Sequence, residues 1–105
     1  MEWLACCLAF ALPLARAADA PAEPRRSEII HMLRQDCGSC HGLTMKGGLG
    51  PPLLPAALKD KDAEQLRFVV LHGRRGTPMP PWSRFLTDDE AAWVVDLLKN
   101  GLPVD

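Results

Sequence analysis

Cys37-Gly38-Ser39-Cys40-His41 is the stretch that decides the fold of this chain. It holds two thiols three positions apart, with a histidine directly after the second, which is the attachment signature of a c-type haem. Each thiol can add to one vinyl group of the porphyrin, and His41 then lies beneath the iron. The stretch therefore predicts one covalent haem c, attached through Cys37 and Cys40 and ligated by His41.

Two other sites use cysteines at this spacing. A redox-active disulfide occurs at a helix start in a thioredoxin-like βαβ setting, and no alternating strand pattern surrounds Cys37 and Cys40. A structural zinc site needs four ligands, and the other cysteines, Cys6 and Cys7, lie in a segment that we expect to be removed. Both alternatives are weaker than haem attachment.

The segment before the motif predicts export. An apolar run from Trp3 to Leu12 is too short to span a bilayer, and Ala15-Arg16-Ala17 is a small-residue cleavage pattern. We therefore expect a signal peptide over residues 1–17, with an uncleaved anchor as the alternative because Glu2 weakens the usual positive start. Haem is attached to such motifs outside the bacterial cytoplasmic membrane, so we expect a periplasmic protein with no stable membrane insertion after cleavage.

Length and charge limit the domain organisation and the partners that we expect for the rest of the 105 residues. A Pro-rich, charged stretch predicts a flexible lead over residues 18–26, and residues 27–105 suffice for one small domain. The formal net charge is −1, which gives no reason to expect a nucleic-acid partner. We expect a monomer whose haem completes a core that so short a chain cannot build alone.

The apolar periodicity predicts an all-α fold. A first helix begins near Arg25 or Ser27, turns Ile29, Ile30 and Leu33 inward and reaches Cys37. Another helix begins near Asp60 or Asp62 and ends at Gly73.

The last helix has the clearest signal. Thr87-Asp88-Asp89-Glu90 is a capping box, and Asn100-Gly101 is a typical helix end. The residues between them that recur at helical spacing, and that we expect to face the core, are Ala91, Val94, Val95 and Leu98.

The loop over residues 42–54 is rich in Gly and Pro and follows His41 directly. A ligating histidine needs an acceptor at its second ring nitrogen, which fixes the tautomer and raises its basicity. The carbonyl oxygen of Pro51, or of a neighbour, is the candidate acceptor. The alternative is that these prolines only stiffen a turn.

Met79 is the candidate for the second iron ligand. It lies between Pro78 and Pro80 in a predicted loop, and the fixed φ of the prolines can present the thioether with little ordering cost. Met32, at helical spacing, and Met45, close to His41, fit core packing better.

Two other arrangements at the iron stay open. His31 or His72 would give a bis-histidine site, and an open sixth position would allow small molecules to bind.

These motifs together resemble a known family. Four stretches of this chain are similar to the NirC-type members of the class I monohaem cytochromes c. They are Asp36–Gly42, Gly47–Leu53, Leu71–Arg74 and Gly76–Trp82. The resemblance implies a small fold of three to four helices wrapped round one covalent haem. It also implies that Cys37 and Cys40 bind haem, that His41 and Met79 ligate iron, and that Pro51 supports His41.

The same resemblance implies a function. NirC-type cytochromes are encoded with the haem-cd nitrite reductase, so we expect a non-enzymatic electron carrier of denitrification. Ligation by methionine and burial among apolar side chains both favour ferrous iron, so we also expect a positive midpoint potential. Its redox partners would be a cytochrome bc-type donor and the nitrite reductase. The alternatives are an accessory or assembly role for that reductase and its specialised haem, and a five-coordinate haem enzyme or sensor.

Two further expectations concern the charged and aromatic residues near the methionine loop. The basic side chains Lys46, Arg74, Arg75 and Arg84, with the acidic start of the last helix, either steer a redox partner or only keep the surface soluble. We expect Trp82 and Phe85 to pack in the haem pocket and Trp93 to join the terminal helices.

Overall fold

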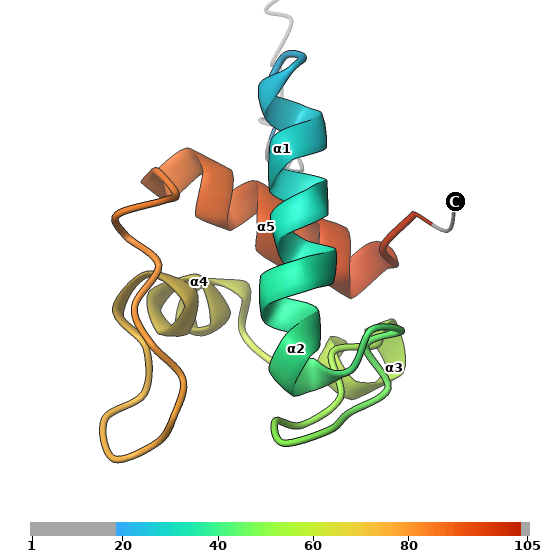
Figure 1. Cartoon of the computed structure of the whole chain (residues 1–105), viewed down its shortest axis with the longest axis vertical. Helices are drawn as coiled ribbons and strands as arrows, with labels where there is room; N and C mark the ends of the chain where they lie inside the picture. The colour runs from blue at the N-terminus through green and yellow to red at the C-terminus, as the bar shows by residue number, and fades with distance from the viewer. Residues whose placement is uncertain (1–18, 104–105) are drawn as a thin grey trace, which may run out of the picture.

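The computed structural model describes residues 19–103, and the regular structure in that range is entirely helical (Figure 1). The helical segments in chain order are α1 (Arg25–Met32), the π-helical η1 (Leu33–Cys37), α2 (Gly38–His41), α3 (Pro55–Leu58), α4 (Ala63–His72) and α5 (Asp88–Asn100). The first three follow one another without a break, so these residues form four continuous helices and no strand. The predicted all-α class is confirmed.

The last helix, α5, begins at the predicted capping box. The Thr87 hydroxyl oxygen accepts from the backbone N–H of Glu90 at 3.1 Å, and a Glu90 carboxylate oxygen accepts from the Thr87 N–H at 3.0 Å. The helix ends where Gly101 donates its N–H to the Leu97 carbonyl at 2.8 Å. Both ends therefore agree with the sequence prediction.

The helix before it, α4, also begins and ends as predicted. The Asp62 carboxylate caps its start by accepting from the Gln65 N–H at 3.3 Å. At the other end Gly73 has φ 71°, a left-handed conformation that few other residues adopt at low cost. The chain can therefore turn sharply away from α4 after His72.

The first helix begins at Arg25, one of the two predicted starts. The lead expected over residues 18–26 thus meets α1 in its last two positions. The expected signal peptide over residues 1–17 lies outside the described residues. Over residues 19–103, no helix combines the length and the apolarity that crossing a bilayer requires.

Two elements were not expected from the sequence. The π-helical η1 widens one turn immediately before the haem motif, and π segments often lie at functional sites. The short α3 begins with Pro55 in its first turn, where the missing N–H costs nothing.

The core lies where the first and last helices cross (Figure 1). Its buried apolar side chains form one cluster consisting of Ile29, Leu33, Leu58, Leu86, Trp93, Val94 and Leu98. Ala91 and Val95 are also buried, whereas Ile30 is partly buried against the cluster. The predicted inner faces of both helices are confirmed, and Trp93 packs in one cluster with Ile29 and Leu33, as expected.

Candidate functional site

The haem motif lies at the end of the long first helix. Cys37 closes η1, Cys40 and His41 lie in α2, and both thiols are free and partly buried. Burial, followed by the nearby Asp36 carboxylate, raises the pKa of the Cys37 thiol to about 11. The motif thus presents two free thiols and an imidazole at the end of one continuous helix.

His41 is held by the loop that follows it. Its Nδ1 lies 2.7 Å from the carbonyl oxygen of Pro51, and because a carbonyl only accepts, Nδ1 carries the proton and donates. Nε2 is then the nitrogen with the free lone pair, which is the form a metal-binding imidazole needs. This is the contact that the sequence suggested for Pro51.

The loop itself folds back onto the end of α2. Gly50 donates its N–H to the Cys40 carbonyl at 2.7 Å, and Gly47 donates to the His41 carbonyl at 2.8 Å. A Cβ at Gly50 would lie 2.7 Å from Cε1 and 2.8 Å from Nδ1 of His41. Only glycine therefore allows the backbone to lie this close to the imidazole, a role that the sequence analysis missed.

The Met79 loop closes onto the end of α4. The Arg74 N–H donates to the Met79 carbonyl at 3.2 Å, and the Trp82 N–H donates to the Val70 carbonyl at 3.0 Å. A Cβ at Gly73 would lie 2.7 Å from the Met79 carbonyl oxygen, so the close approach of the two arms requires glycine there. The loop is thus fixed at both arms, and the Met79 side chain is half-buried.

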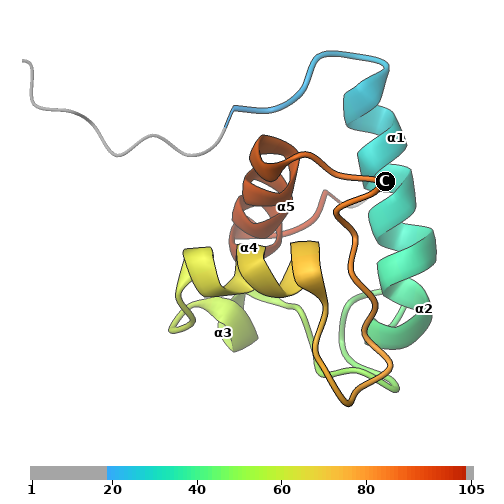
Figure 2. The same ribbon diagram turned by 90° about the vertical axis from the view of Figure 1, so that its left-hand side faces the viewer.

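Both loops lie at the same end of the molecule. In the two perpendicular ribbon views, the loop after α2 and the loop between α4 and α5 form the lower end (Figures 1 and 2). The fold thus brings the His41 and Met79 segments, far apart in the sequence, to one end.

The other candidate ligands differ in burial and contacts. Met45 is buried, with 3% of its surface exposed, and Met32 packs against the core cluster. His31 is exposed, and His72 contacts the ring of Phe68 with ring centroids 4.5 Å apart. Over residues 19–103, no three or more His, Cys, Asp or Glu side chains gather in a way that could hold a metal ion.

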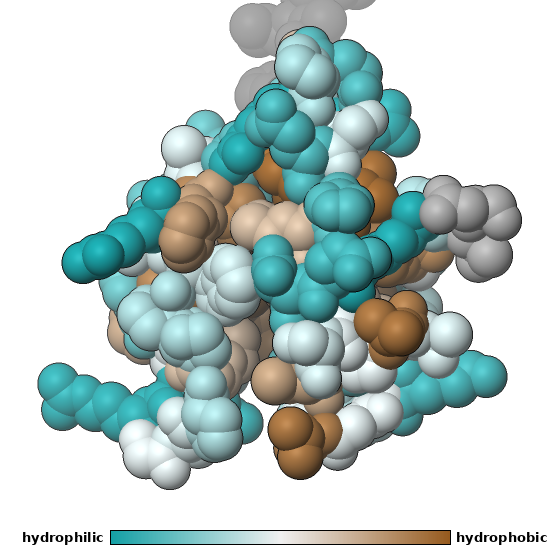
Figure 3. All heavy atoms as spheres, in the orientation of Figure 1, coloured by the Kyte–Doolittle hydropathy of each residue, from teal (hydrophilic) through white to brown (hydrophobic). Residues whose placement is uncertain are grey.

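Several large apolar side chains are exposed near these loops. Leu49 is 93% exposed and Leu43 is 73% exposed, both in the loop after α2, whereas Phe68 and Phe85 are each more than half exposed. Figure 3 shows apolar surface over that loop at the lower end. A large apolar group bound there would bury side chains that otherwise contact water.

The residues present fit a covalent haem. Two free thiols, an imidazole with its tautomer fixed, and a thioether on a restrained loop are the donor set, and exposed apolar side chains supply contact surface. Trp82 is half-buried against the core, and its ring contacts Phe85 with centroids 5.6 Å apart. Their packing against haem stays a prediction.

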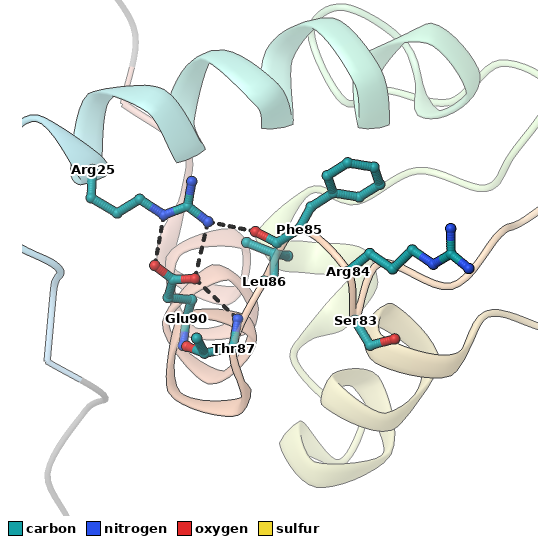
Figure 4. A pocket seen from close by; sticks show the side chains of 7 residues that line it. All are labelled: Arg25, Ser83, Arg84, Phe85, Leu86, Thr87 and Glu90. Atoms are coloured by element: carbon teal, nitrogen blue, oxygen red, sulfur yellow. Dashed lines mark hydrogen bonds and ion pairs between the residues drawn. The ribbon is translucent and has the colours of Figure 1, made fainter.

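An ion pair joins α1 to α5 beside an open pocket of about 420 Å³ (Figure 4). Arg25 Nε and Nη2 contact the two Glu90 carboxylate oxygens at 2.7 and 3.0 Å, and Nη2 also donates to the Phe85 carbonyl. This pairing lowers the pKa of Glu90 to about 2 and raises that of Arg25. Figure 4 shows Arg84 and Ser83 extending away from the pair, so the polar groups that meet in this pocket already bond to one another.

Comparisons with known proteins show a likeness to c-type cytochromes. Residues 27–98 match the family described as cytochrome c oxidase, cbb3-type, subunit III. The chain is 53% identical to cytochrome c55X of Pseudomonas aeruginosa over 100 residues, which cover 94% of this chain and 84% of that protein. A solved structure of the c-type cytochrome NirC superposes with a TM-score of 0.75 and 53% identity, covering 77% of this chain and 95% of the other.

A larger enzyme contains a similar region. Dihydro-heme d1 dehydrogenase of Pseudomonas aeruginosa is 39% identical over 90 residues, which cover 86% of this chain but only 17% of the enzyme.

Proposed function

Because the chain belongs to the small monohaem c-type cytochromes of the NirC and cytochrome c55X group, we propose that it is an electron carrier with His41 and Met79 as iron ligands. Membership of this family implies a covalent haem c. The observation that carries the ligand proposal is the 2.7 Å contact between His41 Nδ1 and the Pro51 carbonyl.

The roles of the residues follow from their chemistry. Cys37 and Cys40 would hold the porphyrin by thioether bonds, and haem c supplies a centre that gains and loses one electron. Pro51 orients His41 so that Nε2 is available, and Met79 offers a soft thioether that favours the reduced state. Two protein ligands leave no coordination position for a substrate, which favours a carrier over an enzyme.

The partners and the location are part of the same proposal. The likeness to NirC-type cytochromes supports a nitrite reductase as electron acceptor and a cytochrome bc-type donor. The apolar segment and cleavage pattern over residues 1–17 support a periplasmic location.

A second function is favoured by one observation. A protein named for acting on dihydro-heme d1 contains a region 39% identical to this chain. This likeness supports an accessory role in handling the specialised haem of the reductase. A second, non-covalent macrocycle retained by the purified protein would distinguish this role from electron transfer alone.

The test is an absorption spectrum of the exported protein, oxidised and reduced, beside that of Met79→Ala. We expect haem that resists extraction by acidified acetone, a ferric charge-transfer band of the iron–thioether bond, and no carbon monoxide binding at neutral pH. Met79→Ala should lose that band and bind carbon monoxide. A colourless protein, or a variant with an unchanged spectrum, would contradict the proposal.

A further inference from the structure

Thr77 lies two residues before Met79, and its hydroxyl joins the two arms of the Met79 loop. Its Oγ1 donates to the Arg74 carbonyl oxygen at 2.8 Å and accepts from the Met79 backbone N–H at 3.3 Å. The Thr77 N–H donates to the same Arg74 carbonyl at 3.2 Å. One side chain thus supplies both the donor and the acceptor that tie the Met79 backbone to the start of the loop.

The rest of the loop closes around this hydroxyl. The Met79 carbonyl accepts from the Arg74 N–H at 3.2 Å, so the Met79 peptide groups are bonded on both sides. Pro78 and Pro80 have no N–H to contribute. A Cβ placed on Gly76, at the loop tip, would meet no atom within 4 Å. Hydrogen bonds within the loop, rather than packing at its tip, therefore fix its conformation.

We propose that Thr77 is the positioning residue for Met79, because its hydroxyl keeps the loop in the conformation that presents the thioether. This inference rests on the proposed ligation of iron by Met79. A ligand on a mobile loop loses conformational entropy when it binds, and a loop already held in place loses less. The hydroxyl therefore strengthens the iron–thioether bond without touching the haem or the sulfur.

The test compares two substitutions in the haem-loaded ferric protein. Thr77→Val replaces the hydroxyl with a methyl group of similar size and removes both side-chain bonds, whereas Thr77→Ser keeps the hydroxyl. Imidazole is added as an external ligand that competes with Met79 for iron. We expect Thr77→Val to bind imidazole about three- to tenfold more tightly than wild type, the range that one or two exposed hydrogen bonds provide.

Two further readouts report on the same bond. Thr77→Val should weaken the charge-transfer band of the iron–thioether bond and lower the midpoint potential, and Thr77→Ser should restore both. Thr44→Val is the matched control, since Thr44 is exposed in the loop after α2 and makes no hydrogen bond through its hydroxyl within the described residues. It should bind imidazole like wild type.

Three results would overturn the inference. The first is a Thr77→Val protein with wild-type imidazole affinity, and the second is a Thr77→Ser protein that behaves like Thr77→Val. The third is a wild-type protein without the thioether band, which overturns the proposed ligation as well and is recognised before any Thr77 variant is made. If Thr77→Val fails to fold by circular dichroism, Thr77→Ala removes the same bonds without added bulk and takes its place.

Discussion

His41 is positioned as much by the missing side chain of residue 50 as by the carbonyl of residue 51. The Pro51 carbonyl oxygen lies 2.7 Å from Nδ1, and the Gly50 backbone lies so close to the ring that an added Cβ would be 2.7 Å from Cε1. A ring held by one hydrogen bond could still rotate about that bond. The adjacent backbone limits the rotation, so both residues define where Nε2 points.

Gly50→Ala should therefore displace the imidazole. Its Cβ would lie 2.7 Å from Cε1, closer than real contacts allow, so either the ring or the loop must shift and the Pro51 bond weakens. We expect the haem-loaded protein to lose about 1–3 kcal/mol of stability in denaturant unfolding, the usual cost of overpacking.

Gly38→Ala is the control for this prediction. Gly38 is helical and its added Cβ would meet nothing closer than 3.5 Å, so this variant should be as stable as wild type or up to about 1 kcal/mol more stable, because alanine favours a helix more than glycine does. Equal stability of the two alanine variants would contradict the role assigned to Gly50.

The sequence revealed the two loops of the site through their composition, but it did not reveal the roles of individual residues within them. Prolines on both sides of Met79 and a Gly-Pro run after His41 marked the two loops. The roles of Gly50 and Thr77 depend on distances between atoms that the loops bring together, and neither residue type is unusual in a loop. They could be found only from the structure.

The helices show a similar division between local and long-range signals. The caps of α4 and α5 involve residues three apart, so the sequence revealed the capping box of α5 and limited the start of α4 to Asp60 or Asp62. The Arg25–Glu90 pair joins residues 65 positions apart, and no local pattern marks it. The π-helical η1 was also missed, because the sequence shows no breaker such as Pro or Gly within Leu33–Cys37.

The Arg25–Glu90 pair should make stability depend on acid pH. Glu90 has a pKa near 2 when folded, below its ordinary value of 4.5, so the folded protein binds this proton less readily than the unfolded chain does. The stabilisation is thus fully present above about pH 4.5 and is lost as pH falls toward 2. Glu90→Gln should remove this part of the pH dependence in acid unfolding followed by circular dichroism.

A second substitution separates the ion pair from the cap. Gln at position 90 can still reach back to the Thr87 N–H, so Glu90→Gln should cost about 1 kcal/mol, whereas Glu90→Ala loses the cap as well and should cost about 2 kcal/mol. Equal losses at neutral pH would mean that the cap contributes nothing beyond the charge pair.

The wide turn of η1 accommodates one extra residue directly before the haem motif. One residue advances an α-helix by about 100°, and a π turn underwinds the helix by about that amount, so the faces before and after η1 stay in the same register as in a helix one residue shorter. Deleting Gln35 should therefore restore α-helical winding and leave His41 facing Pro51. We expect the haem-loaded deletion variant to keep its thioether band.

Gln35→Ala separates the loss of a side chain from the change in winding. Gln35 is exposed, so this variant should match wild type within about 0.5 kcal/mol. A deletion variant that loses the thioether band, beside a Gln35→Ala variant that keeps it, would contradict this account of the π turn.

At the scale of the whole molecule, the first and last helices build most of the core, and the haem motif at the end of the first helix builds the site together with the loops after α2 and α4. The first and last helices supply most of the buried cluster, while the exposed apolar residues Leu43, Leu49 and Phe85 lie on the loops. The buried cluster that stabilises the fold thus comes mostly from the two helices, whereas the loops hold Pro51 and Met79 in place. Substitutions in the loops can change the site without removing the core.

The same separation applies to charge. The basic side chains Lys46, Arg74, Arg75 and Arg84 are exposed on the loops after α2 and α4, whereas the net charge of the chain is −1. Fields of exposed charges are screened over a Debye length of about 10 Å at 0.1 M salt. A reagent that reacts at the loop end of the molecule should therefore respond to the local positive charge rather than to the net charge.

Stopped-flow oxidation of the reduced protein by ferricyanide, a small anion, tests this at low and high salt. We expect the rate to fall severalfold as salt is added, the sign for attraction, although protein and reagent both carry net negative charge. Arg74→Glu with Arg75→Glu should reverse the trend. Lys59→Glu with Lys61→Glu makes the same change in net charge near the end of α3, away from the Met79 loop in both ribbon views, and should keep the wild-type trend. If both double variants respond alike, net charge alone governs the rate and the loop arginines do not steer electron-transfer partners.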